Sequence, residues 1–252
     1  MKPRLKLGID LGSSYTKGVL VNGENQIVDQ YVVKTGFDFK RASTRIMEKL
    51  SENYEIAMPV YTCGYGRDQV EFDHISNSEI IALSKAVYLK FGKKCSVIDI
   101  GGQDTKFIKI NEQGQVDKFK MNRKCAAGTG SFLEEIAFRL DISPLEFNTL
   151  SDDATEEIRI NSYCTVFAIS EIIGLMKKGA TISNIAVGIY NSIIERCLEI
   201  VAADETIIIT GGVPETHPTI VRLFKKRFSQ VESPENSQFY AAWGNVLLNE
   251  KK

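Results

Sequence analysis

The chain has 252 residues, of which 43% are hydrophobic and 25% charged, as in an ordinary globular protein. Lys and Arg number 31 against 32 Asp and Glu, so the net charge of −1 gives no basic excess for binding nucleic acid or an anionic membrane. No apolar run reaches the length of a membrane span, and no apolar leader precedes the first strand, so we expect a cytoplasmic protein. The odd count of five cysteines argues against a disulfide framework, and two histidines make a histidine-rich metal site a poor candidate.

Strands alternate with helices along the chain, which predicts an α/β fold with helices layered on a sheet. Two hairpins are predicted, at residues 5–35 and 96–119. The other predicted elements are helices at 39–54, 78–91, 130–140, 166–178, 182–203 and 237–249, and strands at 59–63 and 206–210.

One segment of the chain occurs twice. IDLGSSYTK at residues 9–17 returns as IDIGGQDTK at residues 98–106, and the register continues without a gap, so that Asn22 matches Asn111. Each copy predicts a strand, a glycine-containing turn and a second strand. The duplication therefore predicts two lobes, one of residues 1–93 with the C-terminal helix at 236–252, and one of residues 94–235.

Each copy carries the residue types that bind Mg²⁺ and phosphate. Asp10 and Asp99 end an apolar strand, where a carboxylate can hold a hydrated Mg²⁺ ion. Lys17 or Lys106 can stabilise charge during phosphoryl transfer. Backbone and side-chain donors for phosphate come from Gly12, Ser13, Ser14, Tyr15, Thr16, Gly101, Gly102, Gln103 and Thr105. Two acidic hairpins that bind one polyphosphate make nucleotide use the first hypothesis, whereas an ordinary hairpin turn is the alternative for either copy by itself.

Two further glycine-rich segments extend the nucleotide hypothesis. Thr210-Gly211-Gly212-Val213 follows an apolar strand, where glycine lets a flat ligand such as adenosine approach the backbone. A plain strand-to-helix turn is the alternative. Gly128-Thr129-Gly130 opens a predicted helix, whose first N–H groups are available to phosphate.

Two of the cysteines stand before predicted helices. Cys125 precedes the Gly-rich helix start and Cys164 the next helix, so the field of each helix N-terminus favours a thiolate, as do Arg123 and Lys124. Thiolates bind zinc and iron–sulfur clusters. A four-iron cluster takes four cysteines, which a two-fold dimer would supply. The alternative is that both are small buried residues, as we expect for Cys63, Cys95 and Cys197.

These segments together resemble a known superfamily. Residues 10–17, 99–106 and 210–213 resemble the phosphate and adenosine motifs of actin, the sugar kinases and the heat-shock chaperone ATPases. Residues 99–104, 122–134 and 164–168 look like those of the activators of 2-hydroxyacyl-CoA dehydratases and the ATPase subunits of benzoyl-CoA reductase. The resemblance covers nearly the whole chain and implies a two-lobed, actin-like (ribonuclease H-like) ATPase fold.

The resemblance also implies a function. It implies an anaerobic homodimer that holds one [4Fe-4S] cluster between subunits through Cys125 and Cys164. ATP hydrolysis would drive an electron from ferredoxin or flavodoxin into a dehydratase-like or other iron–sulfur enzyme. The implied catalytic residues are Asp10, Asp99, Gln103 and Asp104. The implied nucleotide-binding residues are Gly12, Ser13, Ser14, Tyr15, Thr16, Lys17, Gly101, Gly102, Lys106, Gly128, Thr129, Gly130, Gly211, Gly212 and Val213.

The sequence departs from the family at three places. Ile169 stands where Glu is common, Pro214 where Ala is common, and Trp243 where small residues are usual. Three alternatives stay open. The first is a small-molecule kinase of the same superfamily with Asp104 as base toward a substrate hydroxyl. The second is a nucleotide-dependent binding module, and the third is a dimer bridged by zinc through the same thiolates.

Overall fold

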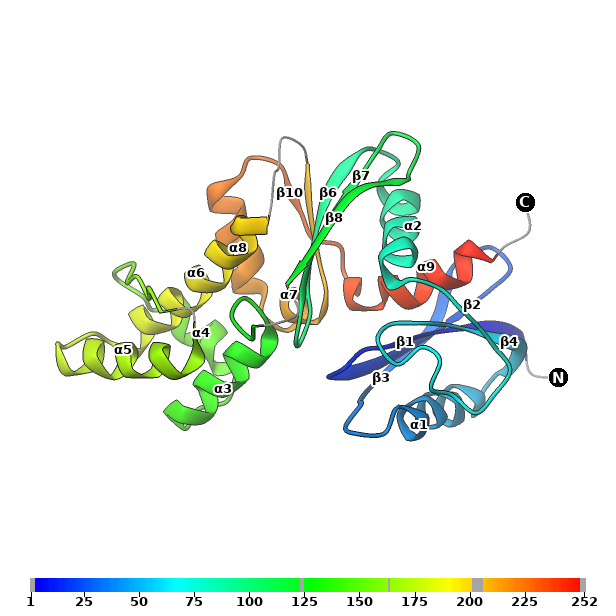
Figure 1. Cartoon of the computed structure of the whole chain (residues 1–252), viewed down its shortest axis with the longest axis horizontal. Helices are drawn as coiled ribbons and strands as arrows, with labels where there is room; N and C mark the ends of the chain where they lie inside the picture. The colour runs from blue at the N-terminus through cyan, green and yellow to red at the C-terminus, as the bar shows by residue number, and fades with distance from the viewer. Residues whose placement is uncertain (1–2, 123–124, 163, 201–205, 250–252) are drawn as a thin grey trace. The chain divides into compact units, whose positions relative to one another are not determined.

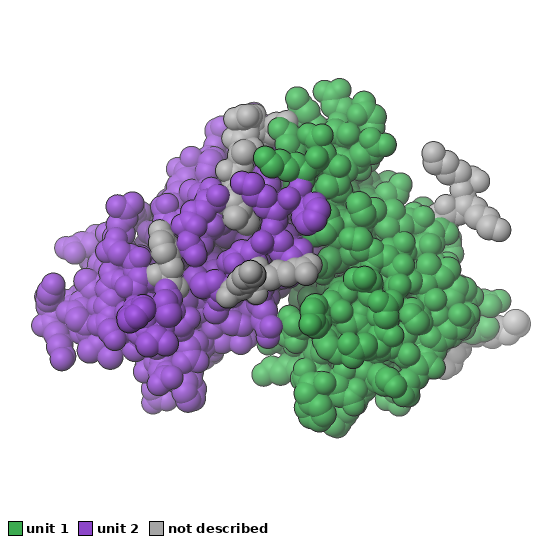
Figure 2. Space-filling model, viewed as in Figure 1, with its two compact units in different colours: residues 1–94, 108–118, 238–252 green, residues 95–107, 119–237 purple. Residues whose placement is uncertain are grey.

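The computed structural model describes residues 3–122, 125–162, 164–200 and 206–249. It divides into two compact units, shown in two colours in Figure 2. Unit 1 consists of residues 1–94, 108–118 and 238–252, and unit 2 of residues 95–107 and 119–237. The functional lobes expected at residues 1–93 with 236–252, and at 94–235, stay a prediction.

The first sheet has the strand order β3-β2-β1-β4-β5, with β4 parallel to β1. Helix α1 packs through Ile46 on the face that carries Ile9, and α9 packs through Val246 on the opposite face, beside Val19 (Figure 1). Helix α2 packs beside α9. The bounds are β1 Arg4–Leu11, β2 Tyr15–Val21, β3 Ile27–Lys34, α1 Phe39–Ser51, β4 Glu55–Cys63, β5 His74–Ser76, α2 Glu79–Phe91 and α9 Tyr240–Leu248, preceded by a short 3-10 helix at Ser237–Phe239.

The second sheet has the order β10-β9-β6-β7-β8, with β9 parallel to β6. Its core joins Ile98 and Ile209 of the strands to apolar side chains of the helices, such as Phe132, Ile172 and Ile189. The bounds are β6 Cys95–Ile100, β7 Thr105–Ile110, β8 Val116–Asn122, α3 Gly130–Leu140, α4 Glu146–Asp152, α5 Thr165–Lys177, α6 Ile182–Ile200, β9 Ile207–Thr210, α7 Gly212–Thr216, α8 Pro218–Arg227 and β10 Val231–Glu232.

The sequence repeat is also a structural repeat. In the turn that follows β2, Asn22 Oδ1 accepts the N–H groups of Glu24 at 3.0 Å and Gln26 at 2.9 Å. In the turn that follows β7, Asn111 Oδ1 accepts the N–H groups of residues 113 and 115 at the same two distances. The duplicated hairpins predicted from the sequence are therefore confirmed, and each continues into a third strand, β3 in the first copy and β8 in the second.

Several elements were not predicted from the sequence: β5, α4, α7, α8 and β10. β5, α4, α7 and β10 are too short to show hydrophobic periodicity, whereas α8 begins at Pro218 and carries Ile220, Leu223 and Phe224 at helical spacing, so that signal was missed. Proline is well tolerated at the first turn of a helix, because its missing N–H has no intrahelical partner there.

Candidate functional site

The turn between β1 and β2 is built around one buried ion pair. Asp10 and Lys17 are cross-strand partners, Lys17 Nζ lies 3.3 Å from Asp10 Oδ2, and Asp10 is 7% exposed. Thr35, just after β3, donates its hydroxyl to the Gly12 carbonyl at 2.7 Å and its N–H to the Ser14 carbonyl at 3.0 Å. The neighbouring strand thus fixes the loop that should contact phosphate.

The turn between β6 and β7 repeats this arrangement with an added carboxylate. Lys106 Nζ lies 3.3 Å from Asp99 Oδ2, as in the first copy, and 2.8 Å from Asp104 Oδ1. The Gly101 N–H donates to the Asp104 carbonyl at 2.9 Å and closes the turn, while Gln103 is exposed. The Asp104 carboxylate is therefore already occupied by a lysine.

Each aspartate lies beside the last residue of a parallel strand, and a glycine follows directly after that strand. Thr210 of β9 pairs with Asp99 and donates its hydroxyl to Asp99 Oδ1 at 2.9 Å. Gly211 follows with φ +107, and a Cβ there would collide with the Ile100 backbone. Gly212 opens α7 with free space where a side chain would lie, whereas Val213 is buried in the core.

Gly64 is the matching residue in the first copy, and sequence analysis missed its role. Asp10 pairs with Cys63 at the end of β4, and Gly64 follows with φ +93. A Cβ on Gly64 would lie 2.5 Å from Asp10 Oδ1 and 2.7 Å from the Leu11 carbonyl carbon. The available signal was a glycine directly after an apolar strand, the same signal that singled out Gly211.

The Gly128–Gly130 segment supports the second phosphate loop. The N–H of Gly130 donates to the Gly101 carbonyl at 3.0 Å, and the N–H of Ser131 donates to the Gly102 carbonyl at 2.8 Å. Thr105 donates its hydroxyl to the Gly128 carbonyl at 2.5 Å. The expectation that the first N–H groups of α3 are free for phosphate is therefore wrong for Gly130 and Ser131, because the loop carbonyls already occupy them.

The five cysteines fall into two groups. Cys63, Cys95 and Cys197 are buried, as predicted, and burial raises the pKa of Cys197 to about 12, so it remains a thiol. Cys125 is half-buried and Cys164 is exposed. These two are the cysteines that a metal or cluster can reach.

The two accessible cysteines have different surroundings. Cys164 is the N-cap of α5, in the positive field of that helix, as predicted. Cys125 lies four residues before Thr129, the N-cap of α3, where the field of the helix has largely faded. The pKa of Arg196 of α6 is raised chiefly by its hydrogen bond to Glu199, and nearby Cys125 adds a smaller contribution. Arg123 and Lys124, also expected to favour the thiolate, lie outside the described residues.

A chain of hydrogen bonds that ends at buried His217 links α4, α6 and the start of α8. Asn148 of α4 donates its amide N–H to the Thr216 carbonyl at 2.9 Å and accepts the Tyr190 hydroxyl at 3.1 Å. His217 Nδ1 lies 2.9 Å from the same hydroxyl, so the neutral ring donates to Tyr190. Burial lowers the pKa of His217 to about 4, and the ring is uncharged at neutral pH. The chain fixes the junction between α7 and α8.

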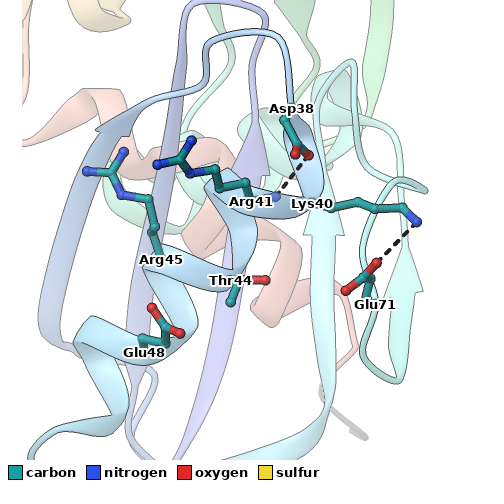
Figure 3. Close-up of a pocket in the computed structure, with 7 residues that line it drawn as sticks. All are labelled: Asp38, Lys40, Arg41, Thr44, Arg45, Glu48 and Glu71. Carbon is teal, nitrogen blue, oxygen red and sulfur yellow. Dashed lines mark hydrogen bonds and ion pairs between the residues drawn. The ribbon is translucent and has the colours of Figure 1, made fainter.

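Unit 1 also has an open surface pocket of about 660 Å³ beside α1 (Figure 3). Lys40 Nζ lies 3.2 Å from Glu71 Oε1, and Asp38 caps α1 by accepting the Arg41 N–H at 3.0 Å. The pocket is lined by Asp38, Lys40, Arg41, Thr44, Arg45, Glu48 and Glu71. None of these residues belongs to the predicted site.

Two absences concern the described part of the chain. Within those residues, no three His, Cys, Asp or Glu side chains are grouped so that they could hold a metal ion. None of the described helices is long and apolar enough to cross a membrane.

The two sheets, with an ion-paired aspartate and lysine at the turn of each hairpin, define an actin-like ATPase. The structure superposes on the activator of 2-hydroxyisocaproyl-CoA dehydratase from Clostridium difficile, solved with bound ADPNP. The TM-score is 0.88 at 31% identity, over 97% of this chain and 93% of that chain. The model of the BadF/BadG/BcrA/BcrD ATPase family matches residues 7–249, and the chain belongs to that family. The resemblance and fold predicted from the sequence are confirmed.

Two characterised relatives match along their whole length. The activator of lactoyl-CoA dehydratase from Anaerotignum propionicum is 35% identical over 247 residues, which cover 96% of this chain and 95% of the relative. The (R)-2-hydroxyglutaryl-CoA dehydratase activating ATPase from Acidaminococcus fermentans is 32% identical over 254 residues, which cover 98% of this chain and 97% of the relative.

Proposed function

We propose that the protein is an ATP-hydrolysing electron donor that activates a 2-hydroxyacyl-CoA dehydratase or a related iron–sulfur enzyme. One observation carries the proposal: the segment that bears Cys125 is hydrogen-bonded to the second phosphate loop. Thr105 binds the Gly128 carbonyl, and the Gly101 carbonyl binds the N–H of Gly130. A change at the phosphate loop therefore reaches a candidate redox ligand within a few bonds.

The two hairpins would handle the phosphates of MgATP. Asp10 and Asp99 would hold the hydrated Mg²⁺ ion, and Lys17 and Lys106 would stabilise the charge that develops on the transferred phosphoryl group. Gln103, exposed at the tip of its turn, would orient the attacking water. Gly211 and Gly212 would leave room for adenosine. We assign Asp104, through its contact with Lys106, to positioning that lysine.

Cys125 and Cys164 fit an iron–sulfur cluster in donor chemistry and accessibility. Both are reachable from solvent, unlike the other three cysteines, and Cys164 stands at a helix N-terminus. A second copy of the chain would supply the other two thiolates of a [4Fe-4S] site. Such a cluster supplies one-electron chemistry at low potential when it is bound.

The protein's own part in the electron transfer is binding and timing. Phosphate contacts at Gly101 and Gly102 would shift the loop carbonyls that hold Gly130 and Ser131, and with them the start of α3. Asn122 transmits the same shift, since its amide donates to the Ala127 carbonyl at 3.2 Å. The electron source would be ferredoxin or flavodoxin. The acceptor would be a dehydratase-like partner, since two of the relatives are named as dehydratase activators.

The decisive experiment is anaerobic purification with iron, sulfide and zinc quantitation and a visible spectrum. We expect brown protein with about four irons per dimer. Cys125→Ala and Cys164→Ala should each remove the colour while ATP binding persists, and Cys95→Ala should keep it. Colourless protein after anaerobic reconstitution would refute the electron-transfer function, and zinc in place of iron would indicate a zinc-bridged dimer. Loss of ATP binding in Cys125→Ala would show that its role is misassigned.

A small-molecule kinase is the second candidate, because sugar kinases share the superfamily. It requires a free carboxylate base, and the candidate Asp104 is bound to Lys106 at 2.8 Å. ATP consumption that depends on a sugar or another alcohol, with a phosphorylated product, would favour the kinase. A binding module would bind ATP without reducing any acceptor.

A further inference from the structure

A carboxylate of helix α5 follows its N-cap cysteine by about two turns. Cys164 caps the helix with extended backbone angles, φ −72° and ψ 128°. Glu171 lies seven residues later, in the second turn of the helix. Ala168 and Ile172 are buried in the core and anchor the helix between them.

The Glu171 carboxylate binds the segment that leads to Cys164. Its Oε1 accepts the backbone N–H of Asn161 at 3.0 Å and the side-chain amide of Asn161 at 3.1 Å. Its Oε2 accepts the backbone N–H of Ser162 at 2.8 Å. Two successive backbone N–H groups that converge on one anion form a small anion-binding nest, here filled by the protein's own side chain.

Glu171 is ionised when it makes these contacts. Partial burial raises its pKa, but the hydrogen bonds from Asn161 and Ser162 outweigh this effect and hold the pKa below its usual value. Hydrogen bonds to a charged acceptor are stronger than neutral ones, so the contacts of Glu171 hold residues 161–162 firmly against α5. We call this connection the Glu171 strap.

We infer that Glu171 is a positioning residue for Cys164: it straps residues 161–162 to α5 and so fixes the direction from which the chain delivers the thiol to the helix end. The inference rests on the proposed role of Cys164 as a cluster ligand. Glu171 touches neither the thiol nor the cluster, and it acts through the backbone of two neighbouring residues.

The substitution Glu171→Gln tests the strap, because an amide replaces one acceptor oxygen with a donor that faces an N–H group. In the apo-protein, we expect the amides of Asn161 and Ser162 to exchange hydrogen about tenfold faster or more. In the iron-loaded dimer, we expect a chelator to remove iron about tenfold faster, and the EPR spectrum of the reduced protein to change. Glu171→Asp keeps the charge on a shorter side chain, so its rates of hydrogen exchange and iron loss should lie between those of the wild type and Glu171→Gln.

Glu157→Gln is the matched control, since Glu157 is an exposed residue of the same unit and loses the same charge. The unfolding temperature of apo Glu171→Gln should match that of the control. Wild-type hydrogen exchange, iron loss and EPR spectrum in Glu171→Gln would overturn the inference while leaving the proposed function intact. Iron retained by Cys164→Ala would instead refute the ligand role of Cys164, and with it the proposed function.

Discussion

Gly64 and Gly211 occupy equivalent places at the ends of β4 and β9, each behind a site aspartate. Both have positive φ, and a Cβ on either would strike the strand that carries Asp10 or Asp99. The copies differ one residue earlier, where Thr210 donates its hydroxyl to Asp99 and Cys63 occupies the register position opposite Asp10.

Replacing Gly64 should impair ATP hydrolysis through the Asp10 carboxylate that it adjoins. In Gly64→Ala, the new methyl group has to displace the Asp10 carboxylate, which lies 2.5 Å away. A displacement of about 1 Å at a catalytic group costs about 100-fold in rate, so we expect a fall in kcat of that order. ATP turnover of the purified variants is the measurement.

Gly23→Ala is the control for that experiment, because a Cβ on this exposed residue meets nothing within 4 Å. It should turn over ATP like the wild type. Gly211→Ala should resemble Gly64→Ala. Full activity in Gly64→Ala would mean that Asp10 is not held in its catalytic position by this contact.

At the scale of elements, the chain His217–Tyr190–Asn148 ties α4 and α6 to the junction of α7 and α8. Because burial lowers the pKa of His217 from 6.5 to about 4, the unfolded chain binds a proton more readily than the folded protein. Stability is therefore complete above pH 6.5 and decreases as the pH falls toward 4. The loss across this window is about 3 kcal/mol.

His217→Gln should flatten this part of the pH profile, since an amide can still donate to Tyr190 but does not titrate. The measurement is the free energy of urea unfolding at several pH values between 4 and 7.5. His74→Gln, at the other histidine, should keep the wild-type slope. An unchanged slope in His217→Gln would assign the acid sensitivity to other groups.

The elements that the sequence predicted well are those with strong periodicity or with an internal copy. The hairpin at residues 96–119 was found because residues 9–17 had already displayed its pattern. Gly64 and Gly211 could not be matched in the same way, since 54 residues separate Asp10 from Gly64 and 112 separate Asp99 from Gly211. The helices inserted in unit 2 break the correspondence between the two copies in the sequence. The correspondence reappears only in the structure, where β4 pairs in parallel with β1 and β9 pairs in parallel with β6.

The candidate site was predicted residue by residue, but its supporting contacts were not. Asp10, Lys17, Asp99 and Lys106 followed from their spacing. The hydrogen bonds of Glu171 with Asn161 and Ser162, and the proximity of Arg196 to Cys125, join residues that lie 9 to 71 positions apart. In the sequence, these polar side chains look like many others that are simply exposed to solvent. Contacts of that kind carry no pattern in one sequence.

At the scale of the whole molecule, two candidate ligands per chain mean that the proposed cluster would also link two chains. Val166 and Phe167, just after Cys164, are 70% and 67% exposed in the single chain, which is unusual for two neighbouring large apolar side chains. A second copy bound through the cluster would cover them.

Removing the iron should therefore weaken the dimer. We expect anaerobic chelation to convert the iron-loaded dimer into monomers at micromolar concentration, and Phe167→Asp to lower the dimer fraction before chelation. Light scattering after gel filtration measures both. Lys178→Asp, at an exposed site beyond the end of α5, should behave like the wild type. A dimer that survives complete iron loss would show that protein contacts alone hold it.

The turns at Asn22 and Asn111 lead to a different kind of conclusion. They lie at the far ends of their hairpins from the aspartates, and nucleotide chemistry makes no demand on them. They nevertheless share their hydrogen-bond distances, and each bends through a residue of positive φ, Asn25 in one copy and Gly114 in the other. The two turns therefore repeat the match that residues 9–17 and 98–106 show at the site, so the duplication extends over the whole of each hairpin and not only over the residues that chemistry would need.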